Sequence, residues 1–108
     1  MLEVCVLRVI ACGPTYGYAI AEELAQSGFG TIKGGTLYPL LSRLEGSGLV
    51  EVEWRAGAGG PGRKYYRITG EGQCTLETSA AAWREFAQAT VAFLEPSPTQ
   101  AGGSEKLS

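Results

Sequence analysis

One short stretch of the chain carries side chains that can hydrogen-bond to nucleic acid. Leucines recur there at the spacing of one helix face, at Leu37, Leu40, Leu41 and Leu44. The opposite face of this predicted helix carries Thr36, Tyr38, Pro39, Ser42 and Arg43. Short hydroxyls, one aromatic ring and one cation suit base edges and phosphates. Taken alone, the pattern favours a DNA recognition helix about as strongly as an ordinary solvated face.

The ends of this helix are also marked in the sequence. Thr36 is a good N-cap residue, and Pro39 would then fall in the first turn, where a missing N–H does little harm. Gly46 or Gly48 can adopt the left-handed conformation that ends a helix.

A second candidate site for nucleic acid lies in a basic segment further along the chain. From Trp54 to Arg67 there is no acidic residue, but there are four cations, namely Arg55, Arg63, Lys64 and Arg67. Arg63 and Lys64 follow a glycine-rich tip that leaves room for a phosphate backbone or a minor groove. They could also be solvated charges at a strand end, but their position after the helix above favours DNA.

The tip itself, residues 57–62, matches the pattern G-x-G-x-x-G. A dinucleotide site requires a strand before this pattern, a helix after it and an acidic residue about 20 positions later. Here a predicted strand follows the pattern, so we interpret it as the end of a hairpin and not as a nucleotide site.

Composition excludes several classes of chemistry. The chain of 108 residues contains no histidine and no aspartate, which removes the usual catalytic triads and most zinc sites, and we expect no enzyme activity and no cofactor. The three cysteines lack metal-ligand spacing and are expected to be buried, reduced thiols. Neither a membrane span nor a signal peptide is predicted, so we expect a cytoplasmic protein. The net charge of −2 argues weakly against DNA binding, but local fields matter more.

The elements that position these residues begin with two helices. Residues 2–12 are almost wholly apolar and predict a buried helix that needs cover on several sides, which a second subunit could supply. After Gly13 and Pro14, residues 16–26 predict a second helix with Thr15 as its cap. We expect either Tyr16 or Tyr18 to lie in the core and the other to reach a phosphate. With the helix at Thr36, the order is that of a helix-turn-helix.

The rest of the chain predicts a hairpin and a long helix. Residues 49–55 and 63–69 alternate with the period of a strand around a flexible tip at 56–62, completing a winged helix-turn-helix over residues 1–69. Residues 70–95 predict a helix of roughly 35 Å. Its apolar residues form a heptad-like seam that should pair with a second chain. Residues 96–108 begin with a proline stop and are expected to be a disordered tail.

Three motifs resemble those of PadR-family transcriptional regulators, over about residues 2–95. The opening of the chain, with Gly13-Pro14 and Tyr16-Gly17-Tyr18-Ala19-Ile20, looks like the start of that family. The run from Gly35 to Glu45 followed by Gly48-Leu49-Val50 is similar to its most characteristic motif. Residues 62–69, with Gly72, match its wing strand and the entry to its last helix. The length is similar to that of the short subfamily, which has a single C-terminal helix.

The resemblance implies a mainly α-helical fold with a small β-hairpin, a homodimer and binding to palindromic double-stranded DNA, usually as a repressor. It also implies release by phenolic acids, antibiotics or other hydrophobic compounds. The residues we predict to contact DNA are Tyr16, Thr36, Tyr38, Pro39, Ser42, Arg43, Arg63 and Lys64. The residues we predict at the dimer interface or ligand site are Leu7, Ile10, Leu76, Ala80, Trp83, Ala87 and Thr90. In some short members an aromatic residue at the position of Trp83 faces its dimer mate across a ligand pore, although packing alone would also explain a tryptophan there.

A second hypothesis is that the winged helix has lost DNA binding and docks a protein partner through its last helix. The basic hairpin counts against this alternative.

Overall fold

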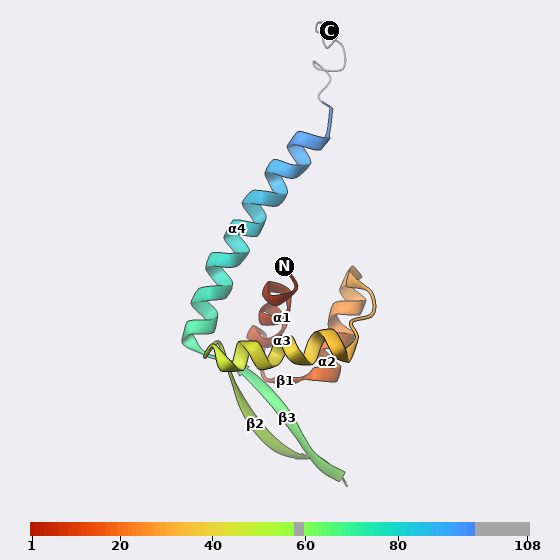
Figure 1. The fold of residues 1–108 in the computed structure, drawn as a ribbon, viewed down its shortest axis with the longest axis vertical. Coiled ribbons are helices and arrows are strands. Elements are labelled where there is room, and N and C mark those ends of the chain that lie inside the picture. The colour runs from red at the N-terminus through yellow and green to blue at the C-terminus, as the bar shows by residue number, and fades with distance from the viewer. Residues whose placement is uncertain (58–59, 97–108) are drawn as a thin grey trace, which may run out of the picture.

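A computed structural model of the chain describes residues 1–57 and 60–96. The elements run in the order α1 (Leu2–Ala11), β1 (Thr15–Tyr16), α2 (Gly17–Leu24), η1 (Ala25–Phe29), α3 (Gly34–Gly46), β2 (Val50–Gly57), β3 (Gly60–Ile68) and α4 (Gly70–Leu94). Three helices form a head, from which the β2–β3 hairpin projects in one direction and α4 in the other (Figure 1). This is the predicted winged helix-turn-helix with one long C-terminal helix.

The core of the head is built from the apolar faces of α1, α2 and α3. Leu7 and Ile10 of α1 are 2% and 0% exposed, and Ile20 of α2 is 0% exposed. They pack with the leucines of α3, with Val50 and Tyr66 of the hairpin and with Leu76 of α4. The cover for α1 that we expected from a second subunit therefore comes from this chain itself. Leu7 and Ile10 belong to the core of the single subunit.

A short strand that the sequence analysis missed lies between α1 and α2. Thr15 pairs with Tyr66 and Tyr16 with Tyr65, which makes β1 the third strand of a sheet with the order β1-β3-β2. The predicted second helix is present, but it begins at Gly17, one residue later than expected. Thr15 is not its cap, because the N-cap position is Tyr16, which makes no side-chain cap hydrogen bond. Two residues are too few for an alternating pattern to be recognised.

The hairpin has the predicted strand alternation. Val50, Val52 and Trp54 lie opposite Ile68, Tyr66 and Lys64, so these alternate positions of the two strands share one face. The strands continue to Gly57 and from Gly60, so they extend into the segment 56–62 that was expected to be a flexible tip. Residues 58–59 lie outside the described part of the chain.

The start of α3 differs from the prediction. The helix begins at Gly34, its N-cap position is Lys33, and no side chain caps it. Thr36 is therefore a helical residue, and Pro39 lies beyond the first turn. The end agrees with one of the two alternatives, since Gly48 has a positive φ of 77° just after the helix.

The junction of hairpin and α4 is tied by Thr69. Its hydroxyl accepts a hydrogen bond from the Gly72 amide at 3.0 Å and donates one to the Gly48 carbonyl at 2.7 Å. Any side chain at position 72 would collide with the Leu49 carbonyl oxygen. The helix entry, the end of α3 and the start of β2 thus meet at one point.

Three further expectations concern the rest of the chain. The cysteines are free but not buried: Cys12 and Cys74 are exposed and Cys5 is half-buried, which corrects the sequence interpretation. Among the described residues, no helix is both long and apolar enough to cross a bilayer. Residues 97–108 of the expected tail lie outside the described part.

Replacing Thr69 with alanine should lower the free energy of unfolding by about 1–2 kcal/mol, because the α4 cap and the bond to the Gly48 carbonyl are both lost. Urea unfolding followed by far-ultraviolet circular dichroism at one protein concentration measures the change. Thr78→Ala, at an exposed position of the same helix, is the control and should not lower the free energy of unfolding. Equal losses in the two variants would contradict the capping role.

Candidate nucleic-acid interface

The outward face of α3 is polar and accessible. Its leucine stripe is buried, with exposures of 0–4% at Leu37, Leu40, Leu41 and Leu44. Every residue predicted to read DNA on this helix is exposed, namely Thr36, Tyr38, Pro39, Ser42 and Arg43. The buried stripe therefore sets the rotation of α3 that presents these side chains.

A surface groove of about 430 Å³ lies where α3, the start of α2 and β3 meet. It is lined by Tyr16, Gly17, Tyr18, Tyr38, Ser42, Arg63, Lys64 and Tyr66. The fold thus brings together Tyr16, Tyr38, Ser42, Arg63 and Lys64 from the predicted DNA-contact set. Thr36, Pro39 and Arg43 lie on α3 outside the groove lining.

Gly17 is a groove residue that the predicted contact set omits. A Cβ atom at this position would lie only 2.5 Å from the Tyr38 hydroxyl oxygen and 2.7–2.8 Å from its ring carbons. The absence of a side chain at Gly17 lets the Tyr38 ring approach the first turn of α2. Its position between Tyr16 and Tyr18 was the available signal, but nothing in the sequence linked it to Tyr38, which lies far along the chain.

The cations of the groove interact with rings and with one carboxylate. The Arg63 guanidinium lies 4.4 Å from the centre of the Tyr16 ring, which in turn lies 5.3 Å from that of Tyr65. The Lys64 ammonium lies 3.6 Å from a carboxylate oxygen of Glu45 on α3 and 5.6 Å from the centre of the Tyr66 ring. Stacking leaves the guanidinium N–H groups of Arg63 available to a phosphate.

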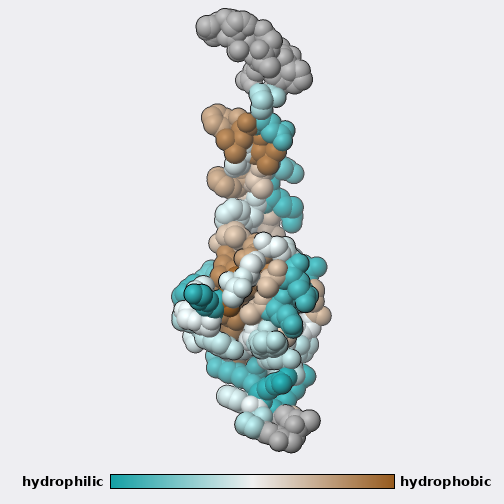
Figure 2. Space-filling model, turned by 90° about the vertical axis from the view of Figure 1, so that its right-hand side faces the viewer, coloured by the Kyte–Doolittle hydropathy of each residue, from teal (hydrophilic) through white to brown (hydrophobic). Residues whose placement is uncertain are grey.

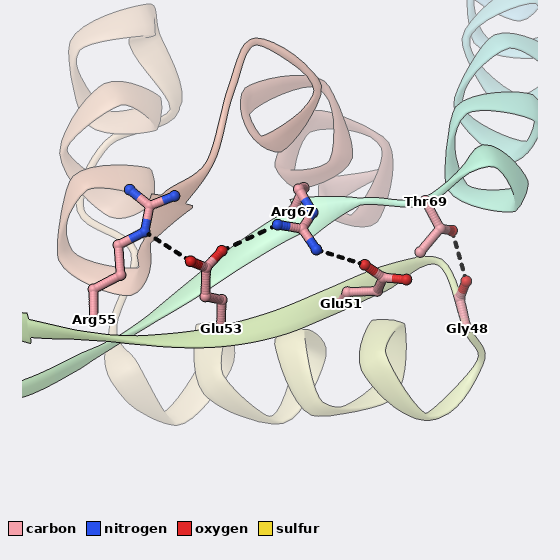
Figure 3. Close-up of polar contacts among 6 residues, drawn as sticks. All are labelled: Gly48, Glu51, Glu53, Arg55, Arg67 and Thr69. Carbon is pink, nitrogen blue, oxygen red and sulfur yellow. Dashed lines mark hydrogen bonds and ion pairs between the residues drawn. The ribbon is translucent and has the colours of Figure 1, made fainter.

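Other cations of the basic segment are neutralised on the outer face of the hairpin. The Arg67 guanidinium contacts Glu51 at 2.8 Å and Glu53 at 3.0 Å. Glu53 also contacts Arg55 at 3.5 Å, which produces a line of alternating charge across the two strands (Figure 3). The segment from Trp54 to Arg67 has no acid of its own, but β2 supplies Glu51 and Glu53, across the strand pair to Arg67 and along the same strand to Arg55. Of its four cations, Arg63 alone forms no ion pair within the described chain.

Burial changes the acidity of one groove residue. Tyr66 is 3% exposed, and removal of its hydroxyl from water raises its pKa above the ordinary 10.0. Lys64 lowers the pKa of the same phenol, but by less.

The predicted interface residues of α4 separate into two groups. Leu76, at 6% exposure, belongs to the core of the head, and Ala80 is half-buried. Trp83 and Ala87 are exposed, and the Thr90 hydroxyl donates a hydrogen bond to the Phe86 carbonyl of its own helix. Trp83 and Phe86 meet edge to face at 5.6 Å and, with Ala82, line an apolar hollow.

The distal part of α4 leaves a row of apolar side chains in water. The exposed fractions are 61% at Phe86, 53% at Val91, 88% at Phe93 and 70% at Leu94. Figure 2 shows hydrophobic residues gathered along one side of the rod and hydrophilic residues along the other. Within the described residues, no group of three histidine, cysteine or acidic side chains is placed to hold a metal ion.

Comparisons with known proteins agree on one family. The profile of the transcriptional regulator PadR-like family matches residues 6–78. The transcriptional regulator Rv3488 of Mycobacterium tuberculosis is 35% identical over 83 residues, 77% of this chain and 76% of that protein.

Solved structures show the same likeness. A PadR-like transcriptional regulator from Bacillus cereus aligns with a TM-score of 0.80 and 34% identity, covering 89% of this chain and 93% of that one. A PadR-family regulator from Eggerthella lenta aligns with a TM-score of 0.78 and 40% identity, covering 89% and 83%.

The raised pKa of Tyr66 predicts an alkaline loss of stability. Above pH 10 the folded state keeps the proton of the Tyr66 hydroxyl, whereas the unfolded chain releases it. The stability that Tyr66 contributes is therefore complete below about pH 10 and is lost as pH rises through the pKa of the folded state. The ultraviolet titration of the wild type minus that of Tyr66→Phe isolates this phenol. A midpoint above 10 is expected in the native protein and a midpoint near 10 in urea. A native midpoint at or below 10 would contradict the effect of burial.

Proposed function

This chain belongs to the PadR-like family of transcriptional regulators, and we propose that it controls transcription by binding double-stranded DNA with α3 and the β2–β3 hairpin. The observation that carries this proposal is the groove at which Tyr38 and Ser42 of α3 meet Arg63 and Lys64 of β3. Hydrogen-bonding groups on an exposed helix and cations on an adjacent hairpin are the two components of groove reading and phosphate contact.

The side chains divide into two roles. The residues on the outward face of α3 approach base edges and sugars, namely Thr36, Tyr38, Pro39 and Ser42. Three cations and one hydroxyl hold phosphates, namely Arg43, Arg63, Lys64 and the Tyr16 hydroxyl. These contacts fix the register of the head on the duplex without reading its sequence.

The functional unit is a homodimer joined through α4. The support is the row of exposed apolar residues from Phe86 to Leu94, which is a large unpaired surface for so small a chain. Two heads in a symmetric dimer can read two half-sites about one helical turn apart, roughly 34 Å, so the operator is a palindrome. A regulator of this kind acts in the cytoplasm, where the DNA is.

Bound at its operator, the dimer represses, and a flat hydrophobic or phenolic compound releases it. The support for an effector site is the hollow lined by Ala82, Trp83 and Phe86, whose side chains are all apolar. A ligand between two such hollows lowers DNA affinity if it binds more tightly to a dimer whose heads are spaced wrongly for the operator. The loss of DNA affinity equals this difference in ligand affinity between the two spacings.

The alternative, a protein-interaction module without DNA binding, relies on the same exposed α4 face. A mobility shift with the DNA upstream of the chain's own gene separates the two, because only the DNA-binding function predicts a shift that survives excess random duplex.

Arg63 provides the sharpest test of the phosphate role, because it forms no ion pair among the described residues. Arg63→Ala should weaken binding to operator and random duplex alike and flatten the slope of log K against log salt by about 1 for each subunit bound. Arg63→Lys is the matched control and should keep the slope, since the charge remains. Fluorescence anisotropy at several salt concentrations measures both. An unchanged slope in the alanine variant would remove Arg63 from the DNA contacts.

Trp83→Ala tests the assignment of α4. Loss of an aromatic side chain that the interface buries costs about 1–2 kcal/mol or more, so the dimer dissociation constant should rise at least about fivefold. Gln88→Ala, an exposed polar position on the same helix, should leave it unchanged. Sedimentation equilibrium measures the constant. If the Trp83→Ala variant still dimerises but no longer binds a phenolic acid, Trp83 belongs to the effector site and not to the dimer interface. If the wild type is a monomer, the dimer proposal is wrong.

A further inference from the structure

An ion pair joins α3 to the first turn of α1. The Arg43 guanidinium reaches a Glu3 carboxylate oxygen with Nη2 at 2.6 Å and with Nε at 3.2 Å. Both nitrogens contact the same oxygen, and the side chains are 62% and 48% exposed. The carboxylate therefore occupies the guanidinium edge that a phosphate would use.

Arg43 and the groove lie on opposite edges of the outward face of α3. Seven residues make about two helical turns, so Arg43 shares one edge with Thr36, whereas Tyr38 shares the other edge with Glu45. The edge of Tyr38 and Glu45 meets the hairpin cation Lys64. The edge of Arg43 meets Glu3.

We propose that Glu3 is a specificity-determining residue that competes with DNA phosphate for Arg43. In the free protein the carboxylate neutralises this cation, so a head that meets random duplex gains no phosphate contact there. At a fitting site, where α3 is seated by its base contacts, Arg43 exchanges the carboxylate for a phosphate. Glu3 thereby lowers non-specific affinity more than specific affinity. This proposal rests on the DNA-binding function proposed above.

The corresponding ion pair on the other edge of α3, between Glu45 and Lys64, is weaker. Glu45 approaches Lys64 at 3.6 Å, a longer contact to a rotatable ammonium, so it releases the cation more readily than the Glu3–Arg43 pair. Exposed ion pairs contribute little to stability, so removing Glu3 should change DNA binding without unfolding the head.

Glu3→Gln tests the proposal in the full-length protein. Its affinity for random duplex at about 0.1 M salt should rise about 5- to 10-fold per subunit, and the salt slope should steepen by about 1, because one more phosphate is neutralised. Operator affinity should rise less, so the ratio of specific to random binding falls. Glu22→Gln is the matched control: it removes one negative charge from an exposed position of α2 that forms no ion pair among the described residues.

Arg43→Ala tests the same pair without altering α1. In the wild-type background it should weaken operator binding, where Arg43 holds its phosphate, but change random-duplex affinity by less than about twofold. In the Glu3→Gln background it should reverse the whole gain in random-duplex affinity. If Glu3→Gln and Glu22→Gln have the same effect, or if Arg43→Ala weakens random binding equally in both backgrounds, the competition is overturned while the DNA-binding function stands. A folded wild type that binds neither operator nor random duplex overturns both.

Discussion

The buried leucine stripe of α3 is the interaction on which the site depends. Four side chains with exposures of 0–4% hold the helix against the core, and each contributes roughly 1.5–3 kcal/mol of burial. A rotation of one residue, about 100°, would place Tyr38 or Ser42 against the core and turn a leucine to water. The same contacts that stabilise the head therefore fix which polar groups are available to a ligand.

The second constraint is the close approach of chain segments that are distant in sequence. The Tyr38 ring reaches α2 only because Gly17 lacks a side chain, and the first turn of α4 packs against Leu49, between α3 and β2, only because Gly72 does. Thr69 bonds both the first turn of α4 and the Gly48 carbonyl. The direction in which α4 leaves the head is therefore fixed against the connection between α3 and β2.

The sequence predicted what repeats along the chain and missed what depends on distant partners. The stripe of α3, the faces of the hairpin and the long last helix follow from periods of 3.6 and 2, and the structure has all three. The two-residue strand at Tyr16 and the uncapped start of α3 have no such period. The Glu3–Arg43 pair joins positions 40 residues apart, so spacing along the chain carries no sign of it. Composition suggested a basic hairpin, but glutamates of β2 and α3 neutralise much of that charge.

This neutralisation limits how strongly one head can hold DNA. Arg67 and Arg55 are occupied by Glu53 and Glu51, and Lys64 and Arg43 each face a carboxylate, so the electrostatic part of binding rests on few free cations. A head with few phosphate contacts has weak non-specific affinity. In the proposed dimer, useful affinity at an operator comes from two heads held together, because the second head binds at a high effective concentration once the first is in place. On this proposal, the geometry of the α4 pair controls DNA binding more strongly than any single contact in the groove, and the proposed apolar effector near Trp83 acts on that geometry.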